Sequence, residues 1–448
     1  METSVTSPKR LLKTFSLAAV IFLTVSGGPY GLENLLQYVG KDGSLLLLII
    51  VPLLWDLPTI FSVLELNSMM PVEGGYYKWV ERALGKRWAF YEVWWSCLYS
   101  FTDLAVYPAL FVTYASFFFP SIMHWSIPIR LAVIWVSALL NILGIVPVGK
   151  ISKMLAAVIL IPFVILFGAA LFNNSFHFST PSFSLHGIGF SALGMGLYTV
   201  MWNFLGWDNT TTYAGEVDKP VKSYLKSMLF AFVLVMFFYL LTTFIAQNSG
   251  VGLSELVDSG YPILGVKLGG NWLGVLLSIG GMASALGIFS AVMLSISRVP
   301  KVMADDKLLP KALGKLHPRF NTPYLSILIC AAVVSCMVVF TFTELIVIDV
   351  ILYGAGLFLE FISLIALRIK EPDAPRPFKI PLNTFCLSAM LLLPIAVYSI
   401  AITGVLSKPD SDHYMIYFAL GALLTAELIW QLIKLGKRKK QLKELPVA

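Results

Sequence analysis

Apolar runs of about twenty residues recur along the whole chain, and they constrain its fold more than any other feature of the sequence. A helical run of that length crosses the hydrocarbon core of a bilayer, which is about 30 Å thick. Of the 448 residues, 58% are hydrophobic and 13% are charged, whereas about a quarter of the residues in a soluble domain are charged. We therefore predict an all-α membrane protein, with the lipid bilayer as a partner and no separate soluble domain.

We predict about twelve membrane spans, each bounded by charged residues, proline or glycine. In chain order they cover residues 14–39, 44–66, 88–116, 127–143, 151–172, 188–213, 225–246, 272–296, 323–342, 345–367, 385–404 and 413–433. The first run leads into glycine and proline instead of a small-residue cleavage site, so we expect a retained helix there and not a signal peptide.

The basic residues assign the connecting loops to two sides of the membrane. If successive spans alternate in direction, all but four of the 32 lysines and arginines lie on the side that both termini share. The four exceptions are Lys41, Arg130, Lys267 and Lys408. Because cytoplasmic loops carry the excess of basic residues, we predict cytoplasmic termini and, by default, the plasma membrane. The net charge of +7 then reflects topology and contact with anionic lipid, and no nucleic acid is expected as a partner.

Two of the predicted spans contain residues that interrupt a membrane helix. Gly27, Gly28 and Gly31, with a proline among them, lie inside the first span, and a polar stretch, WNFLGWDNTTTYAGEVDKP, lies in the sixth. Helix breaks near the middle of the bilayer bind charged groups of substrate or ion in transporters. A proline kink packed by neighbouring helices is the alternative. Because the two breaks lie five spans apart, an odd number, a repeat of that length is inverted across the membrane.

This spacing predicts the organisation of the chain. Residues 14–172 form a first repeat, residues 188–367 form a second repeat, residues 385–433 add two helices, and residues 434–448 form a basic cytoplasmic tail. The basic residues of the tail are expected to anchor it at the membrane surface.

Deep in the spans, the ionisable residues are nearly all acidic. They are Glu33, Asp56, Asp103, Asp208, Glu360 and Glu427. An ionisable residue in such a position costs about 2.5–3.5 kcal/mol on insertion scales and is a functional candidate by default. Without internal basic partners, these carboxyls must be protonated, hydrogen-bonded or neutralised by a cation that visits the site. We interpret a visiting organic cation as the best fit.

Glu33, Asp103 and Asp208 can converge on one cavity if the first, third and sixth spans pack together. We predict that they bind the cationic substrate and that one of them carries a coupled proton. The other three acids, at positions 56, 360 and 427, are predicted to form structural hydrogen bonds. Glu216, at the cytoplasmic end of the sixth span, is predicted to be a gate residue, or to form a surface pair with nearby Lys219 and Lys222.

Aromatic and amide side chains near these acids are further candidates. Trp202, Asn203, Trp207 and Tyr353 are predicted to contact the substrate, and Tyr107 is predicted to act as a gate. The face of an aromatic ring attracts an ammonium group. The alternative is that these rings only pack against their neighbours, because 13% of the chain is aromatic.

Motifs of enzymes and ATP-driven pumps do not occur in the sequence. It contains no GxxxxGK[ST] phosphate-binding loop, no HExxH metal motif and no GxSxG nucleophile motif. The four cysteines lie in apolar runs without metal-ligand or redox spacing. We expect no catalytic residue, no metal and no cofactor.

Several stretches resemble the amino acid, polyamine and organocation superfamily of transporters from the first span to the eleventh. PVEGGYYKWVERALG, AGEVDKP, SRVPKVMADDKLLPKAL and NTPYL are similar to its common signatures. VSGGPYGLE, YPALF, WNFLGWDNTTTYAGEV and LEFISLIALRIKEPDAPRPFKIPL are similar to its polyamine and proton symporter branch.

The resemblance implies a five-plus-five inverted repeat of the LeuT type with two added helices, alternating access and proton-coupled uptake. It implies that the break from Gly27 to Gly31 forms the floor for the ligand. It also implies that Glu33 and Asp103 occupy acidic positions of the branch, and that Trp207 with Asp208 matches its Trp-Asp pair.

The sequence therefore predicts proton-coupled import of a polyamine such as putrescine or spermidine, whose ammonium groups stay charged at neutral pH. An amino acid carrier or exchanger is the alternative, because the amides of the first break suit an α-carboxylate equally well. A sodium-coupled variant would use Ser284 and Ser290 near that break. A scaffold or receptor without transport would not need paired broken helices.

Overall fold

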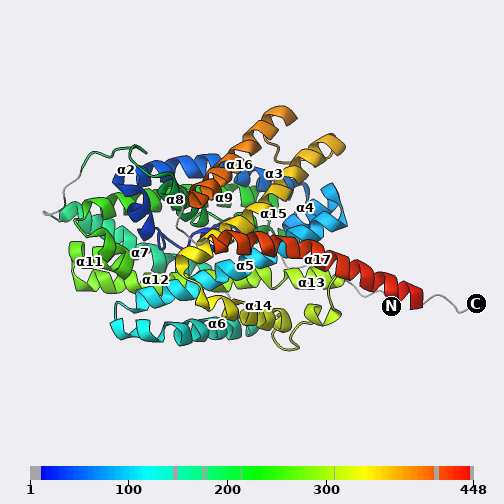
Figure 1. The fold of residues 1–448 in the computed structure, drawn as a ribbon, viewed down its shortest axis with the longest axis horizontal. Helices are drawn as coiled ribbons and strands as arrows, with labels where there is room; N and C mark the ends of the chain where they lie inside the picture. Colours follow the sequence, from blue (N-terminus) through cyan, green and yellow to red (C-terminus); the bar gives the residue numbers. More distant parts are fainter. Residues whose placement is uncertain are drawn as a thin grey trace, which may run out of the picture.

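The computed structural model describes residues 12–144, 150–173, 176, 179–212, 214–306, 308–407 and 413–443. Within these ranges the regular structure is helical, and the strand-like pairing is limited to one isolated bridge between Leu12 and Val217. Most of the long helices run along the longest axis of the molecule, and the end of α17 (Tyr414–Lys443) projects beyond the bundle (Figure 1).

Eight helical segments in the described residues are long and apolar enough to cross a bilayer. They are Glu33–Met69, Pro120–Ile142, Lys150–Phe172, Pro220–Asn248, Asn271–Ile296, Phe342–Lys370, Thr384–Leu406 and Tyr414–Gly436. Three shorter apolar helices cover Thr14–Val25, Phe190–Trp202 and Tyr324–Val339. Each predicted span overlaps one of these segments or α5 (Lys86–Ala115). The prediction of an all-α membrane protein is confirmed.

The first predicted span consists of two helices. The helix α1 (Thr14–Val25) stops before the glycine cluster, and α2 (Glu33–Val51) begins after it. The predicted boundary at residues 40–43 coincides with a kink in α2, because the backbone of Gly40 is not helical there, with φ of 64° and ψ of −172°. A π-helical turn (Pro52–Asp56) and α3 (Leu57–Met69) complete the segment.

The sixth predicted span is also interrupted. The helix α8 (Phe190–Trp202) ends in the middle of the bundle, and the chain continues through two short 3-10 turns, Asn209–Thr212 and Ala214–Glu216. The next long helix, α9 (Pro220–Asn248), starts at a proline. Proline suits the first turn because the backbone N–H groups there have no acceptor within the helix. Both interruptions predicted from the sequence are present.

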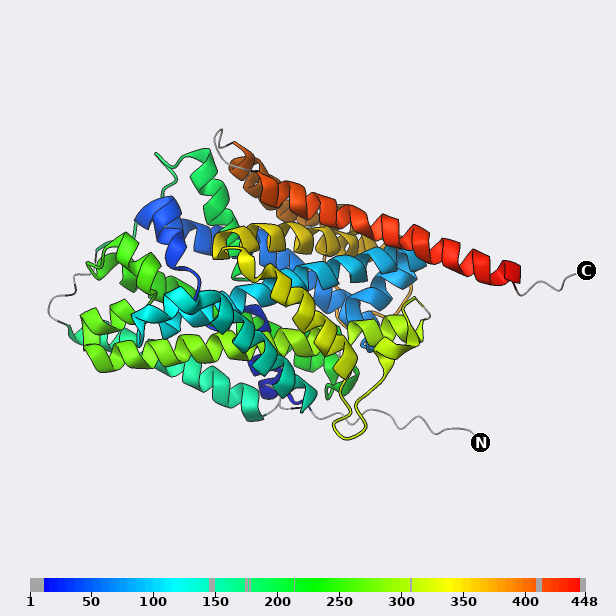
Figure 2. The ribbon, with the colours of Figure 1, turned by 60° about the horizontal axis from the view of Figure 1, so that its bottom comes forward.

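The helices α5 and α15 (Phe342–Lys370) pack against each other along the centre of the bundle, and Figure 2 shows them side by side. The helix α15 begins with a capping box, in which the Thr341 side chain accepts from Glu344 N and the Glu344 side chain accepts from Thr341 N. Buried side chains of α15 occur on all faces of the helix, as expected of a helix enclosed by other helices.

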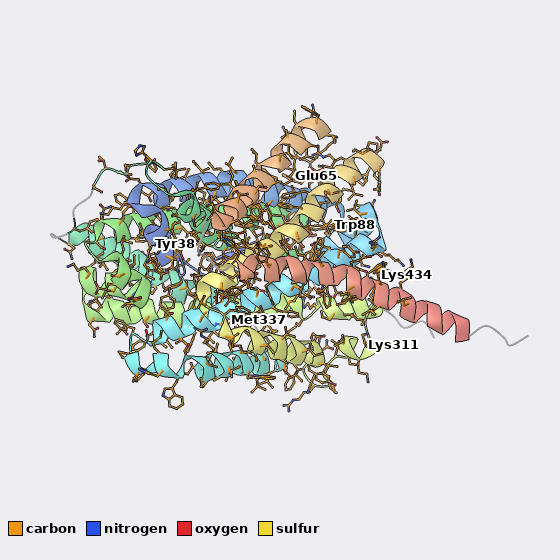
Figure 3. The ribbon with its side chains drawn as sticks, in the orientation of Figure 1. Tyr38, Glu65, Trp88, Lys311, Met337 and Lys434 are labelled. Carbon is orange, nitrogen blue, oxygen red and sulfur yellow. The ribbon has the colours of Figure 1, made fainter. Side chains whose placement is uncertain are left out.

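The remaining long helices enclose this pair. They are α6 (Ser126–Ile142), α7 (Lys150–Phe172), α12 (Asn271–Ile296), α14 (Tyr324–Cys336) and α16 (Thr384–Leu406). Short helices α4 (Gly75–Leu84), α10 (Leu253–Ser259), α11 (Pro262–Gly269) and α13 (Val299–Asp305) lie in the connections. Figure 3 shows Lys311 and Lys434 toward one end of the molecule and Tyr38 toward the other.

A buried ion pair fixes the segment that follows α15. Glu65, on α3, accepts from Arg368 Nε at 2.8 Å and from Arg368 Nη2 at 2.5 Å. Arg376 Nε lies 3.4 Å from Glu65 Oε1, and the backbone N–H of Ile380 donates to Oε2 at 2.8 Å. Glu65 is fully buried, and Figure 3 labels its position. The expectation that acids in the spans lack basic partners from the chain therefore does not extend to Glu65.

Replacement of Glu65 by glutamine should strongly destabilise the protein, because it leaves two arginines buried with a neutral partner. Breaking one side of a buried ion pair costs about 3–5 kcal/mol. We expect a clear fall in the thermal midpoint of the protein in detergent. The control is Glu371→Gln, which removes the partly exposed ion pair with Arg82 and should change stability by less than about 1 kcal/mol. Equal midpoints for the two variants would contradict the proposed role of Glu65.

Candidate functional site

The two interrupted helices approach each other closely at Gly206. Its φ is 93°, a conformation that a residue with a side chain adopts only with strain. A Cβ atom at this position would lie 2.9 Å from the carbonyl oxygen of Thr24, at the end of α1, and 2.7 Å from Asn209 Nδ2. Glycine is therefore required both by the turn and by the close approach of the two backbones.

Side chains of the protein already bind several backbone groups of the first break. The amide of Gly31 donates to Glu33 Oε2 at 2.7 Å, and that of Gly28 donates to Ser26 Oγ at 3.1 Å. Ser284 Oγ donates to the carbonyl oxygen of Gly27 at 2.5 Å, and a Cβ atom on Gly27, where φ is 58°, would collide with Ile288. The Ser284 contact with the break is therefore present, whereas no hydrogen bond joins Ser290 to the break within the described residues.

One tyrosine hydroxyl connects the two breaks. Tyr239, on α9, donates to the carbonyl oxygen of Asn203 at 2.9 Å and lies 2.7 Å from Ser26 Oγ. Asn203 follows the last residue of α8, and its own Nδ2 donates to Thr199 O at 2.8 Å. Asn203, predicted to contact substrate, thus makes its observed bonds within the protein.

Glu33 lines a hollow of about 260 Å³ at one end of α5. Its Oε1 accepts from the hydroxyl of Tyr114 at 2.6 Å. Arg130, Gly260 and Phe342 contribute other parts of the lining. We call this hollow the vestibule. It contains charged groups of both signs, Glu33 and Arg130.

Trp202 lies between the vestibule and the centre of the bundle. Its ring packs edge-on against Phe342, with centroids 5.3 Å apart, and lies 6.4 Å from the ring of Tyr107. Gly31 makes room for it, because a Cβ atom on Gly31 would lie 2.8 Å from the indole. Trp202 and Tyr107 thus close the inner side of the vestibule.

Asp103 and Asp349 lie on the inner side of this aromatic layer. Asp103, on α5, accepts from the Tyr107 hydroxyl at 2.5 Å, and the indole of Trp202 lies against the same carboxyl. Although the indole lies close to this carboxyl, Trp202 Nε1 has no hydrogen-bond partner within the described residues. Asp349, on α15, interacts electrostatically with Asp103, and both of its oxygens lack a hydrogen-bond partner among the described residues. The pair is buried.

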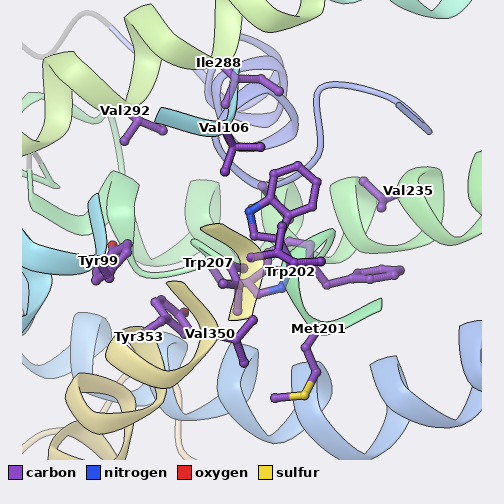
Figure 4. Packing of buried hydrophobic residues seen from close by; sticks show 14 of the residues in the cluster. Tyr99, Val106, Met201, Trp202, Trp207, Val235, Ile288, Val292, Val350 and Tyr353 are labelled. Atoms are coloured by element: carbon purple, nitrogen blue, oxygen red, sulfur yellow. The ribbon is translucent and has the colours of Figure 1, made fainter. Parts of the chain in front are cut away.

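Asp208 belongs to the second break. It contacts α15 at Tyr353, one helical turn beyond Asp349. Its Oδ1 accepts from the Tyr353 hydroxyl at 2.8 Å. The rings of Tyr353 and Tyr99 are perpendicular, with centroids 5.0 Å apart, and Figure 4 shows them next to each other. The Tyr99 hydroxyl bonds to Asn209 Oδ1 in the sixth-span turn. Two aromatic hydroxyls from α5 and α15 thus hold the second break in place.

Trp207 and Asp56 bond to each other. Trp207 Nε1 donates to Asp56 Oδ1 at 3.1 Å, and the indole is only 1% exposed. The structural role predicted for Asp56 is consistent with this bond, whereas the substrate contact predicted for Trp207 has no support in its observed contacts. Glu427, placed deep in a span by the sequence, lies on an exposed face and pairs with Arg87 at 2.7 Å.

The structure therefore distributes the predicted site over three levels. Glu33 lies at the vestibule, Asp103 lies with Tyr107 and Trp202, and Asp208 lies with Tyr353. The sequence interpretation missed two buried acids in the same region, Glu92 on α5 and Asp349 on α15. A signal for them was present, because Glu92 precedes Asp103 by the same eleven residues that separate Asp349 from Glu360.

A polar cluster lies near the N-terminal end of α5, at the opposite end of this helix from the vestibule. Glu216 Oε1 accepts from Arg298 Nη1 at 2.6 Å, so the predicted pairing of Glu216 with Lys219 and Lys222 is replaced by one with Arg298. Next to it, Asp306 Oδ2 accepts from the Tyr77 hydroxyl at 2.6 Å and from Lys78 Nζ at 3.0 Å. We call these five residues (Tyr77, Lys78, Glu216, Arg298 and Asp306) the loop cluster.

The electrostatics of the loop cluster favour its charged form. Partial burial raises the pKa of Asp306, but the hydrogen bonds from Tyr77 and Lys78 outweigh it, and the pKa lies below the ordinary value. A carboxyl with a lowered pKa contributes stability above its unfolded pKa and loses that contribution as the pH falls through the folded value. The cluster should therefore be intact throughout the neutral range.

Comparisons with known proteins extend over nearly the whole chain. Residues 12–425 match a family model described as amino acid permease. The chain is 34% identical to a probable polyamine transporter of Arabidopsis thaliana, over 90% of this chain and 84% of that protein. It is 32% identical to the polyamine transporter RMV1 of the same plant, over 88% of this chain and 81% of that protein. A serine/threonine exchanger of Bacillus subtilis, SteT, is 23% identical over 83% of this chain and 86% of that protein.

Replacement of Gly206 by alanine should destabilise the protein by about 1–3 kcal/mol, the range for a strained backbone conformation. The added methyl group would also press against the Thr24 carbonyl oxygen. Thermal unfolding in detergent measures the effect. The control is Gly421→Ala in α17, where no atom lies within 4 Å of the added Cβ and where alanine should stabilise the helix by up to about 1 kcal/mol. An unchanged midpoint for the Gly206 variant would rule out the close approach.

Asp306→Asn should accelerate amide hydrogen exchange in α4 by up to about fivefold at pH 7, because a partly exposed ion pair contributes about 1 kcal/mol or less. In the wild type, protection factors should be constant between pH 6 and pH 8 and should fall only in strong acid. Asp373→Asn, on an exposed loop, should leave exchange in α4 unchanged. A wild-type protection factor that falls between pH 8 and pH 6 would contradict the lowered pKa.

Proposed function

Because the chain belongs to the amino acid permease family, we propose that it imports polyamines or related organic cations by proton symport with alternating access. The family and the relatives named above are transporters, so the chain is an integral membrane transporter and not an enzyme. The family assignment made from the sequence motifs is confirmed. The proton, the substrate and the transport cycle are the proposed elements.

The proposed topology has twelve spans, of which the first and the sixth are broken. Both termini lie in the cytoplasm, and the protein resides in the plasma membrane. Residues 14–172 and 188–367 form the two inverted repeats, and residues 385–433 add two helices. The interruptions after Val25 and Trp202 support this arrangement, because they occupy corresponding positions five spans apart. The basic tail at 434–448 continues α17, and its last five residues lie outside the described ones.

The single observation that carries the substrate proposal is the set of buried carboxyls along α5 and α15. Asp103, Asp349 and Asp208 are each at most 8% exposed, and within the described ranges no ion pair joins them to a lysine or arginine. Burying an unpaired carboxylate is strongly unfavourable. The ammonium groups of a polyamine neutralise such carboxyls, and they are charged at neutral pH because their pKa is near 10.

In the proposed cycle the cation enters through the vestibule past Glu33. It passes Trp202 and Tyr107, the outer gate, and binds at Asp103 and Asp208, with the rings of Trp202 and Tyr353 against its charged groups. One of the carboxyls of Glu33, Asp103 or Asp208 binds a proton from the outer side and releases it inside. The loop cluster, with the Glu216–Arg298 pair, acts as the inner gate and must open for release.

An amino acid carrier or exchanger of the same fold is the second candidate, favoured by the similarity to the serine/threonine exchanger. In that case an α-carboxylate would bind backbone amides of the first break, with Gly27, Gly28 and Gly31 as the floor. The observed bonds of Gly28 and Gly31 to Ser26 and Glu33 would have to be replaced. This cost makes the cation proposal the better supported one.

Uptake by reconstituted vesicles tests the proposal. We expect an inward proton gradient to drive uptake of labelled putrescine, with no comparable uptake of arginine or leucine. Asp103→Asn should reduce putrescine uptake at least about tenfold, because loss of a charged hydrogen-bonding partner costs about 1.5–3 kcal/mol.

Asp373→Asn, which removes an exposed acid from the connection between α15 and α16, is the matched control and should transport at the wild-type rate. Transport of amino acids without putrescine transport would refute the proposal. It would also move the ligand's anchor from the carboxyls to the amides of the first break.

A further inference from the structure

The helices α5 and α15 run antiparallel with their polar residues in register. The rings of Tyr99 and Tyr353 contact each other across the interface, with centroids 5.0 Å apart, and this contact sets the register. In antiparallel helices, Asp103 then lies level with Asp349, and Glu92 lies level with Glu360. At each step toward the loop cluster, the residue number falls on α5 by as much as it rises on α15. The polar groups therefore form one column between the two helices, with steps of four and then seven residues.

The column carries an acidic pair at each end. On both helices the two acids are eleven residues apart, which is close to three helical turns, so they lie on the same face. At 1.5 Å of rise per residue, the levels of the two pairs are about 16 Å apart. Asp208, held by Tyr353, lies between them and interacts electrostatically with both Glu92 and Glu360.

The inner pair, Glu92 and Glu360, has few partners of its own. Each side chain is 1% exposed, and the Oε2 atom of each lacks a hydrogen bond in the described part of the chain. Ser96 Oγ lies 3.4 Å from Glu92 Oε1, which is a weak bond. Gly356 makes room for this carboxyl, because a Cβ atom there would lie 3.0 Å from Glu92 Oε1. From the sequence, Glu360 is predicted to form structural hydrogen bonds, and Glu92 is not identified as a site residue.

The surroundings of Glu65, a buried acid with a structural role, differ from those of Glu92 and Glu360. Two arginines and a backbone N–H surround its carboxyl. Among the described residues, no arginine or lysine forms an ion pair with Glu92 or Glu360. A pair of facing carboxyls with free oxygen atoms requires a cation from outside the chain, or protons, to be stable in a buried position.

We propose that Glu92 and Glu360 form a second ammonium-binding site, which makes the column a linear site for amines with three or four amino groups. This inference rests on the proposed function and adds the length of the substrate to it. One terminal ammonium binds at Asp103 and Asp349, an internal amino group lies at Asp208, and the other terminal ammonium binds at Glu92 and Glu360.

The dimensions of linear amines fit this assignment. With bonds of about 1.5 Å, a saturated chain advances about 1.25 Å per bond. A four-carbon diamine such as putrescine then spans about 6 Å between its nitrogens, the rise of the four residues from Asp349 to Tyr353. A tetraamine of thirteen bonds, such as spermine, spans about 16 Å, which matches the distance between the two acidic levels. Short diamines therefore reach Asp208 but not the inner pair.

Uptake and competition in reconstituted vesicles, with putrescine, spermidine and spermine as probes, test the inference. The variants are Glu92→Gln, Glu360→Gln and the double variant, each nearly isosteric with the wild type. We expect the affinity for spermine to fall at least about tenfold, the effect of one lost charged contact, while that for putrescine changes by less than about twofold. Spermidine should lie between them.

Two further variants keep the test independent of folding. Gly356→Ala removes no charge but presses on Glu92, so it should weaken spermine selectively. Glu255→Gln, on an exposed part of α10, should leave the affinities for all three amines unchanged.

Equal losses of affinity for all three amines in the glutamine variants would overturn the inference, as would loss of proton-gradient dependence with unchanged length selectivity. If the wild type transports putrescine without a preference for longer amines, the second site is refuted and the proposed function stands. If it handles none of the three, both are refuted.

Discussion

The satisfaction of backbone hydrogen bonds in the absence of water is the constraint on which this structure depends. A membrane helix can stop in the middle of a bundle only if other groups bond to its free amides and carbonyls. Here Ser26, Glu33 and Ser284 bind groups of the first break, and Tyr239 binds a carbonyl of the second. The two unwound segments are thus supported by side chains from α2, α9 and α12, and the glycines permit backbone turns that no other residue makes without strain.

The buried acids divide into two groups according to what neutralises them. Glu65 is paired with arginines of the chain, whereas Asp56 has only the neutral indole N–H of Trp207 as a donor, and its Oδ2 lacks a partner in the described residues. Asp103, Asp208, Glu92, Asp349 and Glu360 have only hydroxyl donors or free oxygens in the described residues. All five lie on or beside the interface of α5 and α15. Uncompensated carboxyls in a buried column cost stability, and apolar residues of similar volume would cost less; the proposed path for cations gives these acids a function.

Much of the fold could be predicted from the sequence, because apolar length and glycine clusters are local signals. The breaks at Gly27 and Gly206 are examples. The site was harder to predict, since pairing depends on which helices touch. Nothing near Glu216 in the sequence identifies Arg298 as its partner, and Trp207 could not be assigned to Asp56 before the packing was known. Glu92 and Asp349 were missed because each lies close to a predicted span end, where acids are unremarkable.

The hydroxyl of Tyr239 has a mechanical consequence. Because it contacts Ser26 in one unwound segment and Asn203 in the other, neither segment can rotate away without giving up a bond in a place that water does not readily reach. Displacement of one segment therefore removes part of the support of the other, and the two should move in concert. A single phenol group thereby couples the two unwound segments mechanically.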